Sequence, residues 1–325
     1  MEDIIDFSRL PVMGEGVTAV TYLLSETRVI KAYKKGVPLE MIESERKISE
    51  TLCRYGIRTP VCYETVRTAE GYGNVYQAMR GGTLTKRMLQ ADEEGLRAWM
   101  QQYAGLAKEL HGVRAEHDIN DCLEIYRFHL KLTRDLLTDE VISLAERTLS
   151  GIPGASNLLH GDMSPGNIML DEGQLYFIDL ATVTKGHPAL DLTVPYMVTL
   201  MWPRFAAMAK AMTEDERAAQ PAWFGYLNRY TEKALSEEAG RMAWVSFLKE
   251  YFCLASNEEA LVWEITKLIR YIAMVKYCLC GSFQAIYPDE LVHKMAEFYS
   301  GQLLSCEEPD LELLKDDRWN LQKAE

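Results

Sequence analysis

Three polar side chains stand in one stretch of the sequence, LLHGDMSPGNIMLDEGQLYFIDLA at residues 158–181, and they are Asp162, Asn167 and Asp179. Magnesium prefers oxygen ligands and usually takes only one or two carboxylates from the protein, with phosphates supplying others. A carboxylate that stays off the metal can accept a proton from an attacking hydroxyl. Each residue alone often caps a turn. The combination instead predicts a site for phosphate transfer.

Two apolar runs within this stretch predict how the three side chains are brought together. Residues 167–170 (NIML) and 175–178 (LYFI) are joined by Asp171-Glu-Gly-Gln174, a spacing typical of a tight β-hairpin. Asp162 then lies on the loop that enters the first strand, and Asp179 lies at the exit of the second. Because a hairpin brings its outer ends together, we expect the three side chains to share one end.

The first eighty residues have the pattern of strands around one helix. Residues 17–24 and 29–33 are β-branched and apolar, and the turn-like Ser25-Glu-Thr27 between them favours a hairpin. A helix is predicted over residues 39–55, ended by Gly56. Two more strands are predicted over residues 61–66 and 74–79, with a turn at Gly71 and Gly73.

The hydrophobic pattern of the sequence changes from strand-like to helical at Gly81-Gly82, a pair that would permit movement between two lobes. From Leu84 to about Leu149 the apolar spacing is helical, and it is helical again after about Asp191. The order therefore predicts a small strand-rich lobe followed by a large helical lobe that contains one hairpin.

The segment HGDMSPGN, residues 160–167, resembles the catalytic loop of the protein-kinase-like superfamily, in which H-x-D is followed by Asn five positions on. The HGD form is similar to the aminoglycoside phosphotransferase and choline kinase branch. IDLA, with Asp179, stands where that fold has its metal-binding D-F-G. GHPALDL, residues 186–192, also resembles this branch, in which an Asp such as Asp191 supports the catalytic loop.

The resemblance implies an α+β, bilobal, protein-kinase-like fold. Its small N-lobe would hold an antiparallel sheet with one helix, and its larger C-lobe would be mainly helical. Residues 1–80 would then form the nucleotide-binding lobe, and residues 81–325 the helical lobe with the catalytic loop and the acceptor pocket. The implied activity is that of an ATP-dependent small-molecule kinase, which moves the γ-phosphate to a hydroxyl.

Catalytic roles follow from the same resemblance. Asp162 would position and deprotonate the acceptor hydroxyl, and Asn167 and Asp179 would hold Mg²⁺ on the phosphates of ATP or GTP. Lys31, in the strand VIKAY, resembles the lysine of the V-A-I-K element and would contact the phosphates. Its partner on the following helix is expected to be Glu45, although Glu43 and Glu50 are rivals there.

The remaining nucleotide contacts are expected from glycines and from the hinge. Gly14 and Gly16 precede the strand predicted at residues 17–24, where a phosphate-covering loop belongs. Ala19 stands where the protein-kinase pattern has its third glycine, so this loop departs from that pattern. Gln77 and Met79 would form the hinge, whose backbone takes the adenine edge.

The composition of the chain indicates which kinds of binding partner and compartment are expected. The chain has 325 residues, enough for two lobes, with 48 acidic and 35 basic residues and a net charge of −13. This balance argues against a nucleic-acid partner. No apolar run approaches the length of a membrane span, and the N-terminus lacks the features of a signal peptide. Seven scattered cysteines do not suggest a disulfide framework, so a cytoplasmic location is predicted.

Several alternatives stay open at this point. The acceptor can be an amino sugar, an amino alcohol or another hydroxylated metabolite, and neither the choice of ATP or GTP nor the oligomeric state follows from the sequence. A catalytically silent nucleotide-binding regulator of the same fold is the main alternative, favoured only by the altered glycine loop. A protein kinase is disfavoured by HGD in place of HRD and by the lack of an A-P-E segment.

Overall fold

The computed structural model describes residues 7–16, 18–115, 119–218, 234–279 and 289–321. The chain divides into two compact units, one formed by Met1–Lys86 and Pro165–Val183 and the other by Arg87–Ser164 and Thr184–Glu325. The assignment of residues 1–80 to nucleotide binding and of residues 81–325 to the acceptor stays a prediction.

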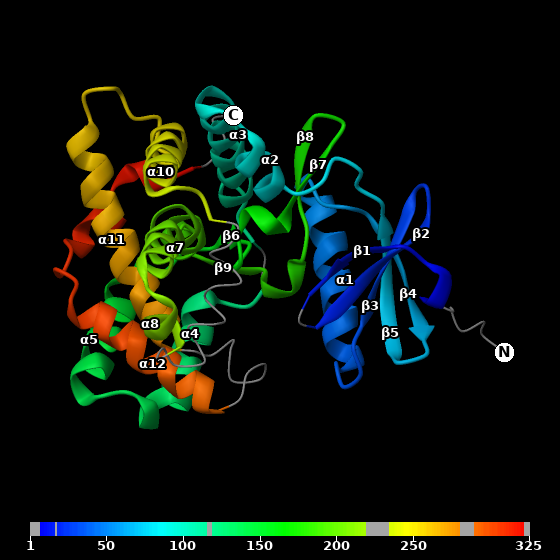
Figure 1. Ribbon diagram of the computed structural model, residues 1–325, viewed down its shortest axis with the longest axis horizontal. Coiled ribbons are helices and arrows are strands. Elements are labelled where there is room, and N and C mark those ends of the chain that lie inside the picture. The colour runs from blue at the N-terminus through cyan, green and yellow to red at the C-terminus, as the bar shows by residue number, and fades with distance from the viewer. Residues whose placement is uncertain (1–6, 17, 116–118, 219–233, 280–288, 322–325) are drawn as a thin grey trace. The chain divides into compact units, whose positions relative to one another are not determined.

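The first unit is built on a five-stranded antiparallel sheet with the strand order β1-β2-β3-β5-β4. Figure 1 shows helix α1 packed beside this sheet, where it contacts β4 and β5. The bounds are β1 Val12–Glu15, β2 Ala19–Ser25, β3 Arg28–Tyr33, α1 Leu39–Arg54, β4 Cys62–Thr68 and β5 Gly71–Gln77.

Helix α1 forms where its spacing predicts it. Its buried residues Ile42, Glu45, Ser49 and Leu52 recur three or four positions apart and so share one face. Gly56 follows directly after the C-cap residue, in a left-handed conformation. The buried face includes one carboxylate, that of Glu45, which must find partners there.

Two local predictions for the sheet differ from the structure. Gly14 lies within β1, a short exposed strand that the sequence pattern did not indicate. Gly71 and Gly73 lie inside β5 rather than in a turn. A Cβ atom at Gly73 would approach the Ile30 side chain to 2.9 Å, so this glycine serves close packing between neighbouring strands.

The hairpin predicted in the opening stretch belongs to the first unit. It consists of β7 (Ile168–Asp171) and β8 (Gln174–Phe177), paired from Ile168 with Phe177 to Asp171 with Gln174. Both residues of its two-residue turn, at positions 172 and 173, have positive φ, as a type I′ turn requires. The backbone N–H of Gly81 donates to Leu170 O at 2.8 Å, which joins the hairpin to the glycine pair.

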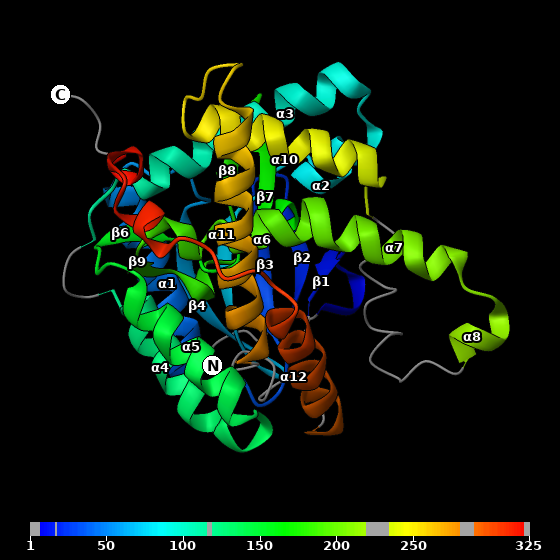
Figure 2. The same ribbon diagram turned by 90° about the vertical axis from the view of Figure 1, so that its left-hand side faces the viewer.

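The second unit is mainly helical, with one short strand pair. Figures 1 and 2 show α10 alongside α3 and show α12 beside α11. Its principal elements are α3 Glu93–His111, α4 Cys122–Thr133, α5 Asp139–Gly151, β6 Asn157–Leu159, β9 Thr184–Gly186, α6 Thr193–Tyr196, α7 Trp202–Ala211, α8 Glu214–Ala218, α10 Glu237–Tyr251, α11 Glu259–Cys278 and α12 Asp289–Leu304. Helix α2 (Leu84–Gln90) crosses the boundary between the two units.

An aromatic core joins α3 to α10 in the second unit. The rings of Tyr103 and Phe247 meet edge to face with centroids 4.9 Å apart, and Trp244 and Tyr251 continue this layer along α10. All four side chains are fully buried. Such a layer fixes two helices rigidly against each other.

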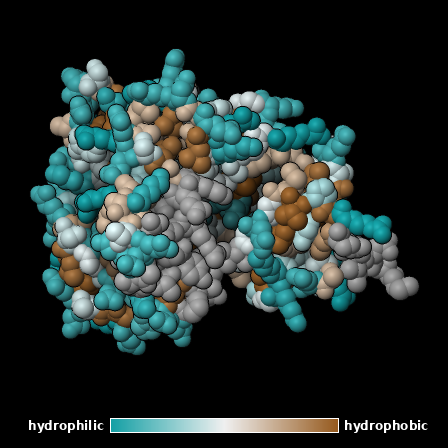
Figure 3. Space-filling model, viewed as in Figure 1, coloured by the Kyte–Doolittle hydropathy of each residue, from teal (hydrophilic) through white to brown (hydrophobic). Residues whose placement is uncertain are grey.

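The predicted fold class is confirmed: an antiparallel sheet with one helix comes first, and a mainly helical part follows. On the face seen in Figure 3, hydrophilic side chains cover most of the described surface, with apolar ones in small groups. Among the described helices, none has both the length and the apolar character needed to cross a bilayer.

Candidate active site

Lys31 on β3 meets two carboxylates within the first unit. Its Nζ donates to Glu45 Oε1 at 2.7 Å and Oε2 at 3.0 Å, and to Asp179 Oδ1 at 2.7 Å. Burial lowers the pKa of Lys31, but the charges of Glu45 and Asp179 together raise it above its usual value. The amine is therefore a fixed positive charge with a carboxylate on either side.

Glu45 is almost fully buried on α1 and has two further partners besides Lys31. The hydroxyl of Tyr33 donates to Glu45 Oε2 at 2.6 Å, and that of Tyr76 donates to Oε1 at 3.3 Å. Burial, followed by the Glu45 charge, raises the pKa of both tyrosines, so they stay protonated as donors. Lys31, Tyr33 and Tyr76 thus make burial of this carboxylate possible.

Asn167 and Asp179 lie at the open end of the hairpin, also in the first unit. Asn167 ends the short turn before β7, and Asp179 follows β8 by two residues. Ile178 N donates to Asn167 O at 2.9 Å, so the two chain segments are adjacent where the hairpin ends. Asp179 has a left-handed backbone with φ of 59°, rare for a residue other than glycine, and its side chain is half exposed.

The donor atoms of Asn167 and Asp179 fit a hard divalent cation that also binds phosphate. They offer an amide oxygen and a carboxylate, the ligand types that magnesium prefers. In the described part of the chain, no group of three or more His, Cys, Asp or Glu gathers to hold a metal by itself. Phosphate oxygens would therefore have to complete the coordination.

Asp162 belongs to the second unit and lies exposed on the HGD loop, residues 160–164. The loop backbone is held by Asp191, which is fully buried. His160 N donates to Asp191 Oδ2 at 2.6 Å, and Gly161 N donates to Oδ1 at 2.7 Å. Gly161 has a φ of 82°, which favours glycine and turns the chain just before Asp162.

His111, at the end of α3, is the third partner of Asp191. Its Nε2 lies 3.0 Å from Asp191 Oδ2, and its Nδ1 lies 2.6 Å from the Tyr251 hydroxyl. An ionised carboxylate can only accept, so Nε2 carries a proton and donates to Asp191. Burial raises the pKa of Asp191, but the hydrogen bond and charge of His111 hold it below its ordinary value.

Two further side chains hold the HGD loop, and the sequence analysis did not identify either. Lys276 Nζ, on α11, donates to Gly161 O at 2.9 Å, and the Tyr103 hydroxyl donates to Met163 O. Both lie far from the loop in sequence, in helices whose local pattern looks like ordinary core packing. No short-range signal marks them, because their role depends on how α3 and α11 pack.

The predicted nucleotide contacts occupy the edge of the sheet and the end of β5. Gly16 N donates to Ala19 O at 2.9 Å, and this turn connects β1, which contains Gly14, to β2. Gln77 N donates to Val61 O and is used within the sheet. Met79, two residues later, is buried.

The sequence matches the phosphotransferase enzyme family (APH) over residues 10–223, more than half of the chain. The chain belongs to this family. The matched range contains Lys31, Glu45, Asp162, Asn167 and Asp179, and the predicted family resemblance is confirmed. A search of curated proteins finds no match.

Solved structures of phosphotransferases share the fold of this APH family member. A choline/ethanolamine kinase family protein from Mesorhizobium loti has 12% identity and a TM-score of 0.55, with 97% of this chain and 93% of that chain covered. The streptomycin–ATP ternary complex of APH(2'')-IIa has 17% identity and a TM-score of 0.52, with 94% of this chain and 93% of that chain covered. ADP-bound aminoglycoside phosphotransferase APH(2'')-Ib has 16% identity and a TM-score of 0.51, with 90% of this chain and 93% of that chain covered. These likenesses show a shared fold, and the family match shows that the chain is a phosphotransferase.

Proposed function

We propose that this phosphotransferase moves the γ-phosphate of ATP to a hydroxyl group of a small molecule. The observation that carries the proposal is the placement of the Lys31 amine within 2.7 Å of both Glu45 and Asp179. Phosphate oxygens need such a fixed cation, and the nearby Asp179 offers a ligand for the metal that accompanies them. Related structures named for bound ADP and for bound ATP support the choice of donor.

The nucleotide would be held by the first unit. Lys31 would donate to phosphate oxygens while Glu45 keeps its amine in place, and Gly14 of β1 and Gly16 after it would cover the phosphates. The backbone at Gln77 and Met79 would contact the adenine edge, leaving the choice between ATP and GTP to direct measurement.

Magnesium would be bound by Asn167 and Asp179 together with the phosphates. When bound, it would neutralise negative charge on the phosphate oxygens. The side chains of the protein contribute the amide and carboxylate oxygens and hold them at the end of one rigid hairpin.

Asp162 would act as the proton acceptor for the substrate alcohol. The hydroxyl proton passes to the Asp162 carboxylate, the hydroxyl oxygen forms a bond to the γ-phosphorus, and the bridging oxygen leaves with ADP. Asp191, Lys276 and Tyr103 fix the loop backbone on both sides of Asp162. Fixed positioning of this kind is the main contribution that a protein makes to phosphate transfer.

The acceptor class is to be sought among amino sugars and amino alcohols. The related structures are named for streptomycin and for choline or ethanolamine kinases, which suggests molecules that carry both hydroxyl and nitrogen groups. We keep the cytoplasm as the proposed compartment, in line with six described cysteines that are free thiols.

The test is a screen of hydroxylated metabolites in two pools, amino sugars and amino alcohols, each with ATP and Mg²⁺. We expect one pool to contain a compound that gains one phosphate by mass spectrometry while ADP is released. Asp162→Asn should reduce this rate by at least about a hundredfold, because it removes the proton acceptor. Asp135→Asn, an exposed aspartate of the same unit, is the matched control and should not change the rate.

Other results would contradict the proposal. Binding of ATP without phosphorylation of any compound would favour the silent regulator instead. Equal rates for Asp162→Asn and the unmodified chain would remove Asp162 from the mechanism. Repeating the screen with GTP decides the donor.

A further inference from the structure

The second unit contains a cavity of about 670 Å³ that lies away from the HGD loop. It is lined by residues of α6, α7, α10, α11 and the π-helical turn Met197–Met201 between α6 and α7. Neither the HGD loop nor Asp191 or Lys276 lines it. Arg270, the lining residue of α11 nearest to Lys276 in sequence, lies about 9 Å along the helix from it at 1.5 Å per residue. The cavity is of a size that holds a metabolite.

The charge of the lining is unusual for so acidic a chain. Four cationic side chains, Arg204, Arg241, Lys267 and Arg270, line the cavity, against two carboxylates from Glu237 and Glu238. The excess is therefore positive, whereas the whole chain carries −13. Cationic side chains gathered in one cavity repel one another, and an anion bound among them would offset that repulsion.

Lys267, Arg241 and Arg270 each contact another side chain, but within the described part of the chain only Lys267 pairs with a carboxylate. Lys267 pairs with Glu264 at 3.0 Å, and Arg241 lies over the Trp263 ring, 4.6 Å from its centroid. Arg270 contacts the Cys306 thiol, but its Nε is buried without a hydrogen-bond partner.

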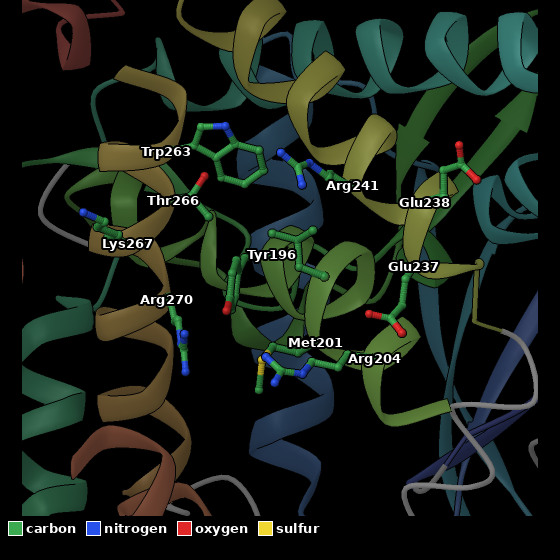
Figure 4. Close-up of a pocket in the computed structure, with 11 residues that line it drawn as sticks. Tyr196, Met201, Arg204, Glu237, Glu238, Arg241, Trp263, Thr266, Lys267 and Arg270 are labelled. Carbon is green, nitrogen blue, oxygen red and sulfur yellow. The ribbon is translucent and has the colours of Figure 1, made fainter. Parts of the chain in front are cut away.

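Tyr196 adds a buried polar group at the same place. Its side chain is 3% exposed and belongs to the lining of the cavity. Figure 4 shows this hydroxyl pointing toward the end of the cavity where the side chains of Arg204 and Arg270 also end. Burial raises the pKa of Tyr196, while the charges of Arg270 and Arg204 act in the opposite direction.

The opposite end of the cavity holds an aromatic side chain. Figure 4 shows the Trp263 ring beside Arg241, away from the Tyr196 hydroxyl, whereas Met201 lies beside Arg204. The aromatic surface at this end therefore comes from Trp263. A ligand that fills the space would therefore carry an anionic group at one end and an apolar or aromatic portion at the other.

We infer that this cavity is a binding site for a small organic anion, with Arg204, Arg270 and the Tyr196 hydroxyl around its phosphate or carboxylate group and Trp263 against its apolar portion. Arginine matches both groups with paired, charge-assisted hydrogen bonds. The site is separate from the residues proposed for phosphate transfer and does not depend on them.

Isothermal titration calorimetry with phenyl phosphate, phenylacetate and neutral benzyl alcohol, in a buffer free of phosphate, tests the inference on the full chain. At least one of the two anions should bind, and the alcohol should not. Arg204→Gln should weaken anion binding by about tenfold or more, since it removes a charge-assisted contact. Tyr196→Phe, which removes one oxygen, should weaken binding by a smaller factor.

Two further variants separate this site from others. Arg97→Gln makes the same charge change at an exposed arginine of α3 and should bind the anions like the unmodified chain. Lys31→Met removes the proposed phosphate contact of the first unit, and it should abolish phosphate transfer but leave this binding intact. The tighter of the two anions shows whether the natural ligand is a phosphate ester or a carboxylate.

The inference is overturned if neither anion binds, if benzyl alcohol binds as well as the anions, or if Arg204→Gln and Arg97→Gln bind equally. Loss of binding in Lys31→Met, with binding retained in Arg204→Gln, would place the probe in the first unit instead. That last outcome would leave the proposed phosphate transfer standing.

Discussion

At the scale of single residues, the central feature is a buried carboxylate with three donors. Glu45 accepts hydrogen bonds from Lys31, Tyr33 and Tyr76, which offset the cost of removing its charge from water. In exchange, Glu45 holds the Lys31 amine at one position. A lysine held in this way pays little entropy when it contacts a phosphate.

Glu45→Gln should lower kcat/KM for ATP by about tenfold to a hundredfold, because Lys31 loses its charged partner. The same change should lower stability, since the two tyrosine hydroxyls lose a charged acceptor. Steady-state kinetics at varied ATP and urea unfolding followed by circular dichroism measure the two effects.

Glu50→Gln on the same helix is the matched control. Glu50 is exposed and pairs with Arg46 on the surface, an interaction worth little. It should leave both quantities unchanged. If the two variants lowered kcat/KM to the same degree, the helix as a whole rather than the Glu45 carboxylate would be responsible.

At the scale of elements, the two units position the polar residues of the candidate active site in different ways. In the first unit a tight hairpin brings the segments of Asn167 and Asp179 together. In the second, helices α3 and α11 and the segment before α6 converge on the HGD loop through His111, Lys276 and Asp191. Polar side chains from distant elements thereby hold a loop that has no regular structure of its own.

Lys276→Met should reduce kcat by about tenfold while leaving the KM for ATP unchanged. The reason is that Gly161 O loses its charged donor, so the loop before Asp162 is less well positioned, whereas the proposed nucleotide contacts lie in the other unit. Lys294→Met, on the surface of α12, serves as the control and should match the unmodified enzyme. A rise in the KM for ATP with unchanged kcat would argue against this positioning role.

At the scale of the whole molecule, a buried histidine links stability to pH. His187 Nε2 donates to Leu314 O at 3.0 Å, and its Nδ1 accepts from Ala189 N, so the ring is neutral. Burial lowers the pKa of His187 to about 4 from an ordinary value of 6.5. As pH falls from about 6.5 toward 4, His187 binds a proton in the unfolded chain but not in the folded chain. Proton binding stabilises the unfolded state, so the free energy of unfolding decreases.

We therefore expect His187 to account for a loss of about 2 kcal/mol in the free energy of unfolding between pH 7.5 and pH 5. Urea titrations at the two pH values give the change in the free energy of unfolding for the unmodified chain and for His187→Gln. The difference between these two changes is the contribution of His187. The variant should show a decline smaller by about this amount. Parallel declines in both chains would mean that other groups carry the pH dependence.

Some features of the molecule could be predicted from local sequence. The hairpin of residues 168–177 and helix α1 follow from apolar runs, turn residues and periodic spacing, all of which act within a few residues. The same patterns failed at β1 and at Gly73. A short exposed strand has no apolar alternation, and the reason for Gly73 is the Ile30 side chain of a neighbouring strand.

The sequence by itself determined the order of the motifs, the family and the chemical nature of the polar residues, because these depend only on residue type and spacing. Only the tertiary structure decided that Tyr76 holds Glu45, that Lys276 and His111 support the HGD loop, and that Tyr196 and two arginines share a cavity. Those contacts join residues far apart in the chain. Their geometry depends on how helices and strands pack, which no local pattern encodes.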